Sequence, residues 1–76
     1  MARERVYDRL LERTAYKLKE IREKKGMSQE QVYYDTKLNI GRIEVGKTNI
    51  SLTTLAILCD YYGVALDEFF KGIKTK

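Results

Sequence analysis

Four glycines divide this chain into segments whose apolar residues recur with helical spacing. Gly26, Gly46, Gly63 and Gly72 each follow such a segment, and the 76-residue sequence contains no proline. Glycine often ends a helix because it adopts the left-handed backbone conformation at little cost. Apolar residues three and four positions apart lie on one face of a helix. The positions of these glycines between segments of helical spacing therefore predict one compact, all-α domain.

The first two predicted helices differ in length. The first runs from about residue 2 to residue 25, and residues 13–14 are a candidate break within it. The second begins at Ser28, which with Gln31 three positions later has the pattern of a capping box, and it fades near Thr36.

Three further helices are predicted in the second half of the chain. One follows Asn39, a good N-cap residue, and ends at Gly46, so it cannot be much longer than two turns. The next begins at Ser51 and ends at Gly63, and the last covers about residues 65–71. The predicted core consists of inward-facing residues of all five helices: Leu18, Ile21, Val32, Ile40, Ile43, Leu52, Leu55, Leu58, Cys59, Val64, Leu66 and Phe69.

Composition excludes several classes of site. The chain has one cysteine and no histidine, which argues against an internal disulfide, a zinc site and the commonest catalytic bases. No carboxylate pair or phosphate-binding glycine loop is visible, so we expect no enzyme activity, metal, cofactor or small-molecule ligand. No apolar run has the length of a signal peptide core or a membrane span, and we expect a cytoplasmic protein.

The net charge of +4 is concentrated in the first third of the chain. Residues 1–25 hold nine Lys and Arg against five Asp and Glu, whereas the rest of the chain is balanced. A basic surface attracts nucleic acid or an acidic partner, and it is also typical of a solvated helix.

The order and spacing of several short motifs resemble the Cro and phage-repressor type of helix-turn-helix domain, often called the Xre family. They are "LKEIREKKGMSQEQV", "GRIEVGKTN" and "SLTTLAILCDYYGVALDEFF", and the resemblance covers about residues 14–70. It implies a five-helix, lambda-repressor-like fold and a transcription regulator that binds double-stranded operator DNA as a homodimer. Residues 1–13 would be a helical extension, residues 14–71 the helix-turn-helix domain and residues 72–76 a flexible tail.

The resemblance also implies roles for individual residues. Arg22 and Glu44 resemble a structural salt bridge between the first and third helices. Gln29 resembles a glutamine that contacts a phosphate and braces the recognition helix, and its alternative role is that of an exposed residue in a first helical turn. The full set of expected DNA-binding residues is Gln29, Lys37, Asn39, Arg42, Lys47, Thr48 and Asn49. Arg42 is the best candidate for a base contact, and Asn39, which can read adenine, is the second. The alternative role of Asn39 is that of an N-cap. Lys37 is a candidate phosphate contact, and its alternative role is that of a solvated turn residue.

The sequence departs from the family pattern at the recognition helix. The distance from Gln29 to Glu44 is about three residues shorter than usual, which removes nearly one turn from the N-terminal end of that helix. Either a short helix still reads bases, or the fold serves protein recognition as an antitoxin-like or adaptor module. Tyr33 stands where a small residue is common, and its ring is predicted to fill the space left by the missing turn.

A single small module covers few base pairs, so a dimer is expected. Two surfaces could supply it: the C-terminal side of the domain or the N-terminal extension, and intramolecular packing is the alternative for both. The candidate interface residues are Val6, Leu10, Ile57, Tyr61, Phe70 and Ile73.

Overall fold

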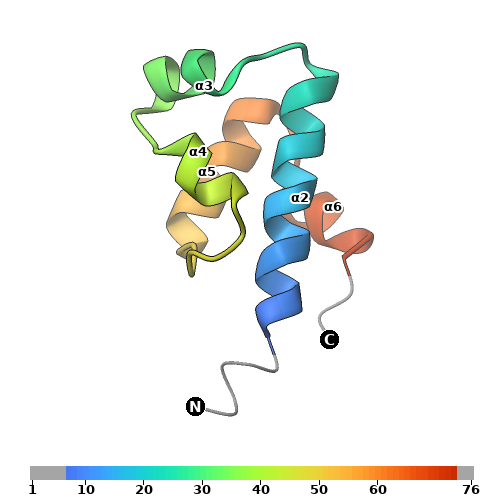
Figure 1. Ribbon diagram of the computed structural model, residues 1–76. Helices are drawn as coiled ribbons and strands as arrows, with labels where there is room; N and C mark the ends of the chain where they lie inside the picture. Colours follow the sequence, from blue (N-terminus) through green and yellow to red (C-terminus); the bar gives the residue numbers. More distant parts are fainter. Residues whose placement is uncertain (1–6, 74–76) are drawn as a thin grey trace.

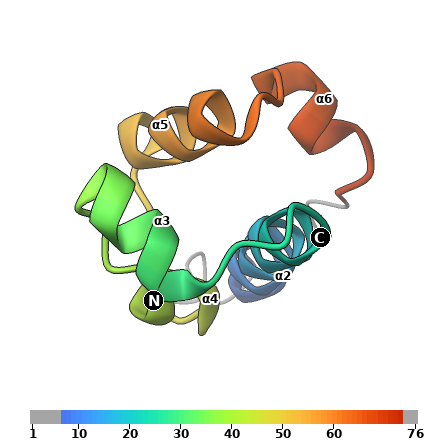
Figure 2. The ribbon, with the colours of Figure 1, turned by 90° about the horizontal axis from the view of Figure 1, so that it is seen from above.

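The computed structural model describes residues 7–73 and contains five helices within them (Figure 1). The helices are α2 (Asp8–Lys24), α3 (Gln29–Thr36), α4 (Ile40–Glu44), α5 (Leu52–Tyr62) and α6 (Leu66–Lys71). No strand occurs in the described part of the chain. Viewed from above, α3 and α4 lie at one side of the molecule and α6 lies at the opposite side (Figure 2). The all-α fold class expected from the sequence is confirmed.

Side chains cap three of the helices at the residues that the sequence indicated. The hydroxyl of Ser28 accepts from the backbone N–H of Gln31, and the hydroxyl of Ser51 accepts from that of Thr54, each at 3.0 Å. Each cap satisfies one N–H that has no partner within its helix. The capping box at Ser28 is only half formed, because the side chain of Gln31 donates to Asp35 and does not accept from the backbone N–H of Ser28.

Helix α2 is continuous through residues 13–14, so the candidate break there is wrong. Thr14 and Ala15 are both 4% exposed and face the interior. Close packing supports the helix at this point: a Cβ on Gly46 would lie 3.2 Å from the Cα of Glu12 and 3.4 Å from the Cβ of Ala15. The turn after α4 therefore packs directly on α2, and Gly46, whose φ is +83°, suits this position by conformation as well as by size.

One cluster of buried side chains joins the helices. It comprises Leu18, Val32, Ile40, Leu55, Leu58, Cys59, Tyr62 and Phe69, and Ile21, Ile43, Val64 and Leu66 pack against it half-buried. Most of the predicted core is thus confirmed, and Tyr62 is an addition to it. Burial raises the pKa of Tyr62 to about 12, and the negative charge of Glu44 acts in the same direction.

Two expectations about apolar residues are wrong. Leu52 is 69% exposed, because it is the first residue of α5 and lies at the edge of the stripe that Leu55 and Leu58 continue into the core. Tyr33 is 52% exposed, so its ring does not act as a core residue in place of the missing helical turn. Val32 is the one buried residue of α3.

Candidate nucleic-acid interface

Helix α4, which was expected to be the recognition helix, is short. Helix α4 has five residues, which correspond to about 7.5 Å along its axis. Three residues, Lys37 to Asn39, separate it from α3. The Oδ1 atom of Asn39 accepts from the backbone N–H of Arg42 at 3.0 Å, so Asn39 caps α4 and its Nδ2 group is not used in that bond. The expected length limit and the expected cap of this helix are both confirmed.

An ion pair holds α4 to α2. The Nε and Nη2 atoms of Arg22 donate to the two carboxylate oxygens of Glu44 at 2.8 and 3.0 Å, and Nη1 donates to the carbonyl of Met27 at 2.7 Å. The side chains of Arg22 and Glu44 are only 9% and 4% exposed. The hydrogen bond to Glu44 raises the pKa of Arg22 above its usual value, against the opposing effect of burial. This bidentate pair fixes the position of α4 against the longest helix.

Gln29 extends this network from α3. Its Nε2 atom donates to Oε1 of Glu44 at 2.9 Å, although the residue as a whole is exposed. A Cβ on Gly41 would lie 3.4 Å from Oε1 of Gln29, so the amide lies close to the backbone of α4. An amide nitrogen carries two N–H groups, and this bond uses one of them. Glu44 therefore connects α2, α3 and α4.

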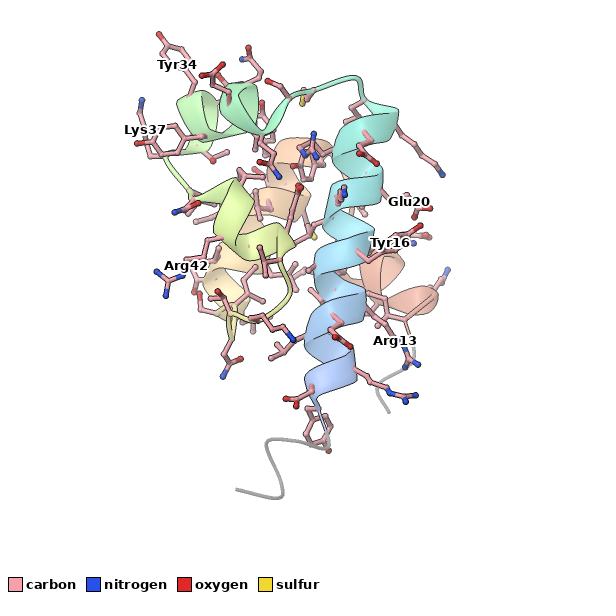
Figure 3. All side chains as sticks on the ribbon, in the orientation of Figure 1. Arg13, Tyr16, Glu20, Tyr34, Lys37 and Arg42 are labelled. Carbon is pink, nitrogen blue, oxygen red and sulfur yellow. The ribbon has the colours of Figure 1, made fainter. Side chains whose placement is uncertain are left out.

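Two of the expected DNA-binding cations project away from the helices. Arg42, on α4, and Lys37, in the turn before it, extend outward on the same side of the molecule (Figure 3). Both residues are exposed. Guanidinium and ammonium groups presented in this way are suited to contact a polyanion. The structure thus places the cationic groups of the turn and of α4 on one side.

The loop between α4 and α5 carries three more expected contacts. Lys47 and Asn49 are exposed, and Thr48 is half-buried. The close packing of Gly46 on α2 fixes the start of this loop. A small hollow lies between this loop and α2, and it is lined by Asp8, Leu11, Glu12, Gly46 and Lys47. The N-terminal part of α2 therefore supports the loop.

The dimer candidates have different environments. Ile57 and Phe70 are 45% and 38% exposed. Tyr61 donates its hydroxyl proton to Asp35 of α3, and this bond lowers the pKa of the Asp35 carboxyl. Leu10 and Ile73 are half-buried, and Ile73 lines a groove on α2 together with Tyr16. Val6 lies outside the described residues.

A cation–π contact next to α4 was not predicted from the sequence. The Nζ atom of Lys37 lies 4.8 Å from the ring centroid of Tyr34, and that ring is 71% exposed. The spacing of three residues was visible in the sequence. The contact depends also on the left-handed conformation of Lys37, whose φ is +64°, and this conformation takes Lys37 out of the helical course of α3.

The same conformation predicts a difference between two substitutions at this position. Lys37→Gly and Lys37→Ala both remove the ammonium group, but only alanine retains a Cβ in the left-handed region. We expect Lys37→Gly to be more stable than Lys37→Ala by about 1 kcal/mol. Urea unfolding followed by circular dichroism measures the difference. Equal stability of the two variants would show that the turn relaxes at no cost.

Two kinds of feature are absent from residues 7–73. No group of three or more His, Cys, Asp or Glu side chains in that range is arranged to hold a metal ion. Among the same residues, no helix combines the length and the apolar character needed to cross a membrane.

Comparison with known proteins identifies the segment that contains α4. The family model described as helix-turn-helix matches residues 36–69, a range that begins at the end of α3 and includes α4, α5 and most of α6. Six of the seven expected DNA-binding residues lie in this range, and Gln29 lies before it. Comparisons with curated proteins and with solved structures gave no match. The matched segment, together with the five-helix fold, supports the resemblance of this chain to helix-turn-helix domains of the Cro and phage-repressor (Xre) type, a family of DNA-binding transcription regulators.

Proposed function

We propose that this protein binds a specific palindromic operator as a homodimer and regulates transcription there. The observation that carries the proposal is Arg42, an exposed guanidinium on a helix that a buried ion pair holds in place. Such a helix can enter the major groove, which admits an α-helix and displays the base edges. Arginine can pair bidentately with guanine, so Arg42 is the main base-reading residue in this proposal.

The other candidates contribute to affinity more than to specificity. Lys37, Lys47, Thr48 and Asn49 would contact phosphates, which position the protein without reading sequence. Gln29 would use its second amide N–H for a phosphate, since the first is bonded to Glu44. Asn39 would offer its Nδ2 group to a base or a phosphate, because its oxygen caps α4.

The short helix makes dimerisation important. A helix of about 7.5 Å spans about two base pairs at 3.4 Å each. Such a short reading length gives little specificity by itself, whereas two copies read two half-sites. The exposed side chains of Ile57 and Phe70 favour the C-terminal side of the domain as the dimer interface.

Selection of bound sequences from random duplex DNA tests the operator proposal. We expect an enriched palindrome whose half-sites lie about one helical turn apart, and an affinity that falls as salt concentration rises. Recovery of no enriched sequence, with equal binding to unrelated duplexes, would contradict the proposal.

Sedimentation of variants tests the dimer. We expect Ile57→Asp and Phe70→Asp to be monomeric, because each would place a charge in an apolar contact. A chain that begins at Tyr7 should remain dimeric, and it keeps the described part of α2 that packs on Gly46. Dissociation of that shortened chain alone would assign the interface to the N-terminal residues instead.

A second candidate function is protein recognition by the same fold. Val45 and Leu52 are 64% and 69% exposed, and both lie next to the loop that carries Lys47 to Asn49. Exposed apolar side chains of this kind also occur at protein interfaces. An antitoxin-like or adaptor role would follow if the selection from random duplex DNA gave no operator and if a protein partner buried the side chains of these two residues.

A further inference from the structure

A groove lies where α3 meets the start of α4. Tyr33 and Glu30 line it from α3, and Ile40 and Gly41 line it from α4. Its lining residues are Gln29, Glu30, Tyr33, Asn39, Ile40 and Gly41. Four of these six are neither expected DNA contacts nor part of the ion-pair network.

The groove exists because α4 begins late and because its first two residues place no large side chain over α3 at this point. Asn39 caps the helix immediately after the turn, so no earlier helical residue covers α3. Gly41 has no side chain, and Ile40 directs its side chain into the core, where it is 2% exposed. The ring of Tyr33 is therefore left half-exposed beside the first turn of α4.

The chemistry of the groove favours a base over a phosphate. Glu30 is one of the lining residues, and its negative charge disfavours a phosphate group beside Tyr33. The Tyr33 ring offers an apolar surface, and the apolar group that DNA displays in the major groove is the 5-methyl group of thymine. We propose that Tyr33 packs on a thymine methyl next to the base pair that Arg42 contacts, and so extends the sequence read by the short α4. This inference rests on the proposed function.

Replacing single thymines in the selected operator tests the role of Tyr33. Deoxyuridine differs from thymidine only by lacking the methyl group, so each thymine of a half-site is replaced by it in turn. For the wild-type chain we expect one position at which binding weakens about fourfold, the effect of exposing one methyl group. Tyr33→Ala should bind the thymine and uracil sites equally at that position. Tyr33→Phe should keep the difference because it keeps the ring.

Tyr16 provides the matched control. It is a tyrosine on α2, 66% exposed, and it lies on the opposite side of the molecule from Lys37 and Arg42 (Figure 3). Tyr16→Ala should leave the thymine dependence unchanged. Circular dichroism of each variant before the binding measurement shows that it is folded.

The remaining outcomes overturn the inference in distinguishable ways. If no thymine position is sensitive, or if Tyr33→Ala retains the sensitivity, then Tyr33 does not read a methyl group and the operator proposal still holds. If Tyr33→Phe behaves like Tyr33→Ala, the hydroxyl and not the ring makes the contact. If the wild-type chain selects no operator, both the inference and the proposed function are wrong.

Discussion

Glu44→Ala is expected to lower the free energy of unfolding by about 3–5 kcal/mol, the usual cost of removing one partner of a buried ion pair. Arg22 would keep its bond to the carbonyl of Met27 but lose both contacts to a carboxylate. Gln29 would lose its partner as well. Domains of this size are stable by about 4–11 kcal/mol, so the variant would lose a large part of its stability. Urea unfolding followed by circular dichroism measures the loss.

An exposed ion pair supplies the control. Glu68 and Lys71 on α6 form a contact of 3.3 Å, but their side chains are 60% and 72% exposed. Glu68→Ala should therefore change stability by about 0.5 kcal/mol or less. The double variant Arg22→Met with Glu44→Leu should recover much of the loss, because no charge is then buried alone. A Glu44→Ala variant as stable as Glu68→Ala would show that the buried pair contributes little.

This result bears on how DNA-binding data are interpreted. Glu44 has no exposed carboxylate to offer DNA, since its side chain is 4% exposed and its two oxygens accept from Arg22 and Gln29. Loss of binding in Glu44→Ala would therefore report a displaced α4 and not a lost contact. Glu44→Gln preserves the shape of the side chain and should give a smaller loss, about 1.5–3 kcal/mol, typical of a hydrogen bond to a charged group.

Helix boundaries could be predicted from the sequence because they depend on local chemistry. Ser28, Asn39 and Ser51 cap the helices that follow them, and each makes its bond to a backbone N–H three residues later. Gly63 ends α5 in the left-handed conformation, with φ of +75°. None of these features needs information from a distant part of the chain.

The exposure of individual side chains could not be predicted in the same way. Leu52 fits the apolar stripe of α5. Nothing in the sequence indicates that the buried part of this stripe begins only at Leu55, one turn later. The exposure of Tyr33 depends on where α4 lies relative to α3, and this is fixed by the contacts of Glu44 with Arg22 and Gln29. Helical periodicity identifies a face but does not show how far its neighbours extend. The groove beside Tyr33 therefore could not be predicted from the sequence.

Arg42→Ala is expected to weaken binding to the selected operator by about 5–150-fold, which corresponds to the 1–3 kcal/mol of a bidentate base contact. Binding to an unrelated duplex should weaken much less, because Arg42 contributes only one charge there. Lys47→Ala is the matched control. Loss of a phosphate contact should weaken binding to both duplexes alike, and it should lower the number of counterions released on binding by about one. Fluorescence anisotropy at several salt concentrations measures both effects.

Arg42→Lys separates the charge of this residue from its geometry. Lysine keeps the positive charge but cannot reproduce the planar pair of donors that a guanidinium offers to guanine. We therefore expect Arg42→Lys to retain the salt dependence of the wild-type chain while losing most of its preference for the operator. If Arg42→Ala instead weakened both duplexes equally, Arg42 would be a phosphate contact. Specificity would then have to come from Asn39, from the groove beside Tyr33 or from the shape of the DNA.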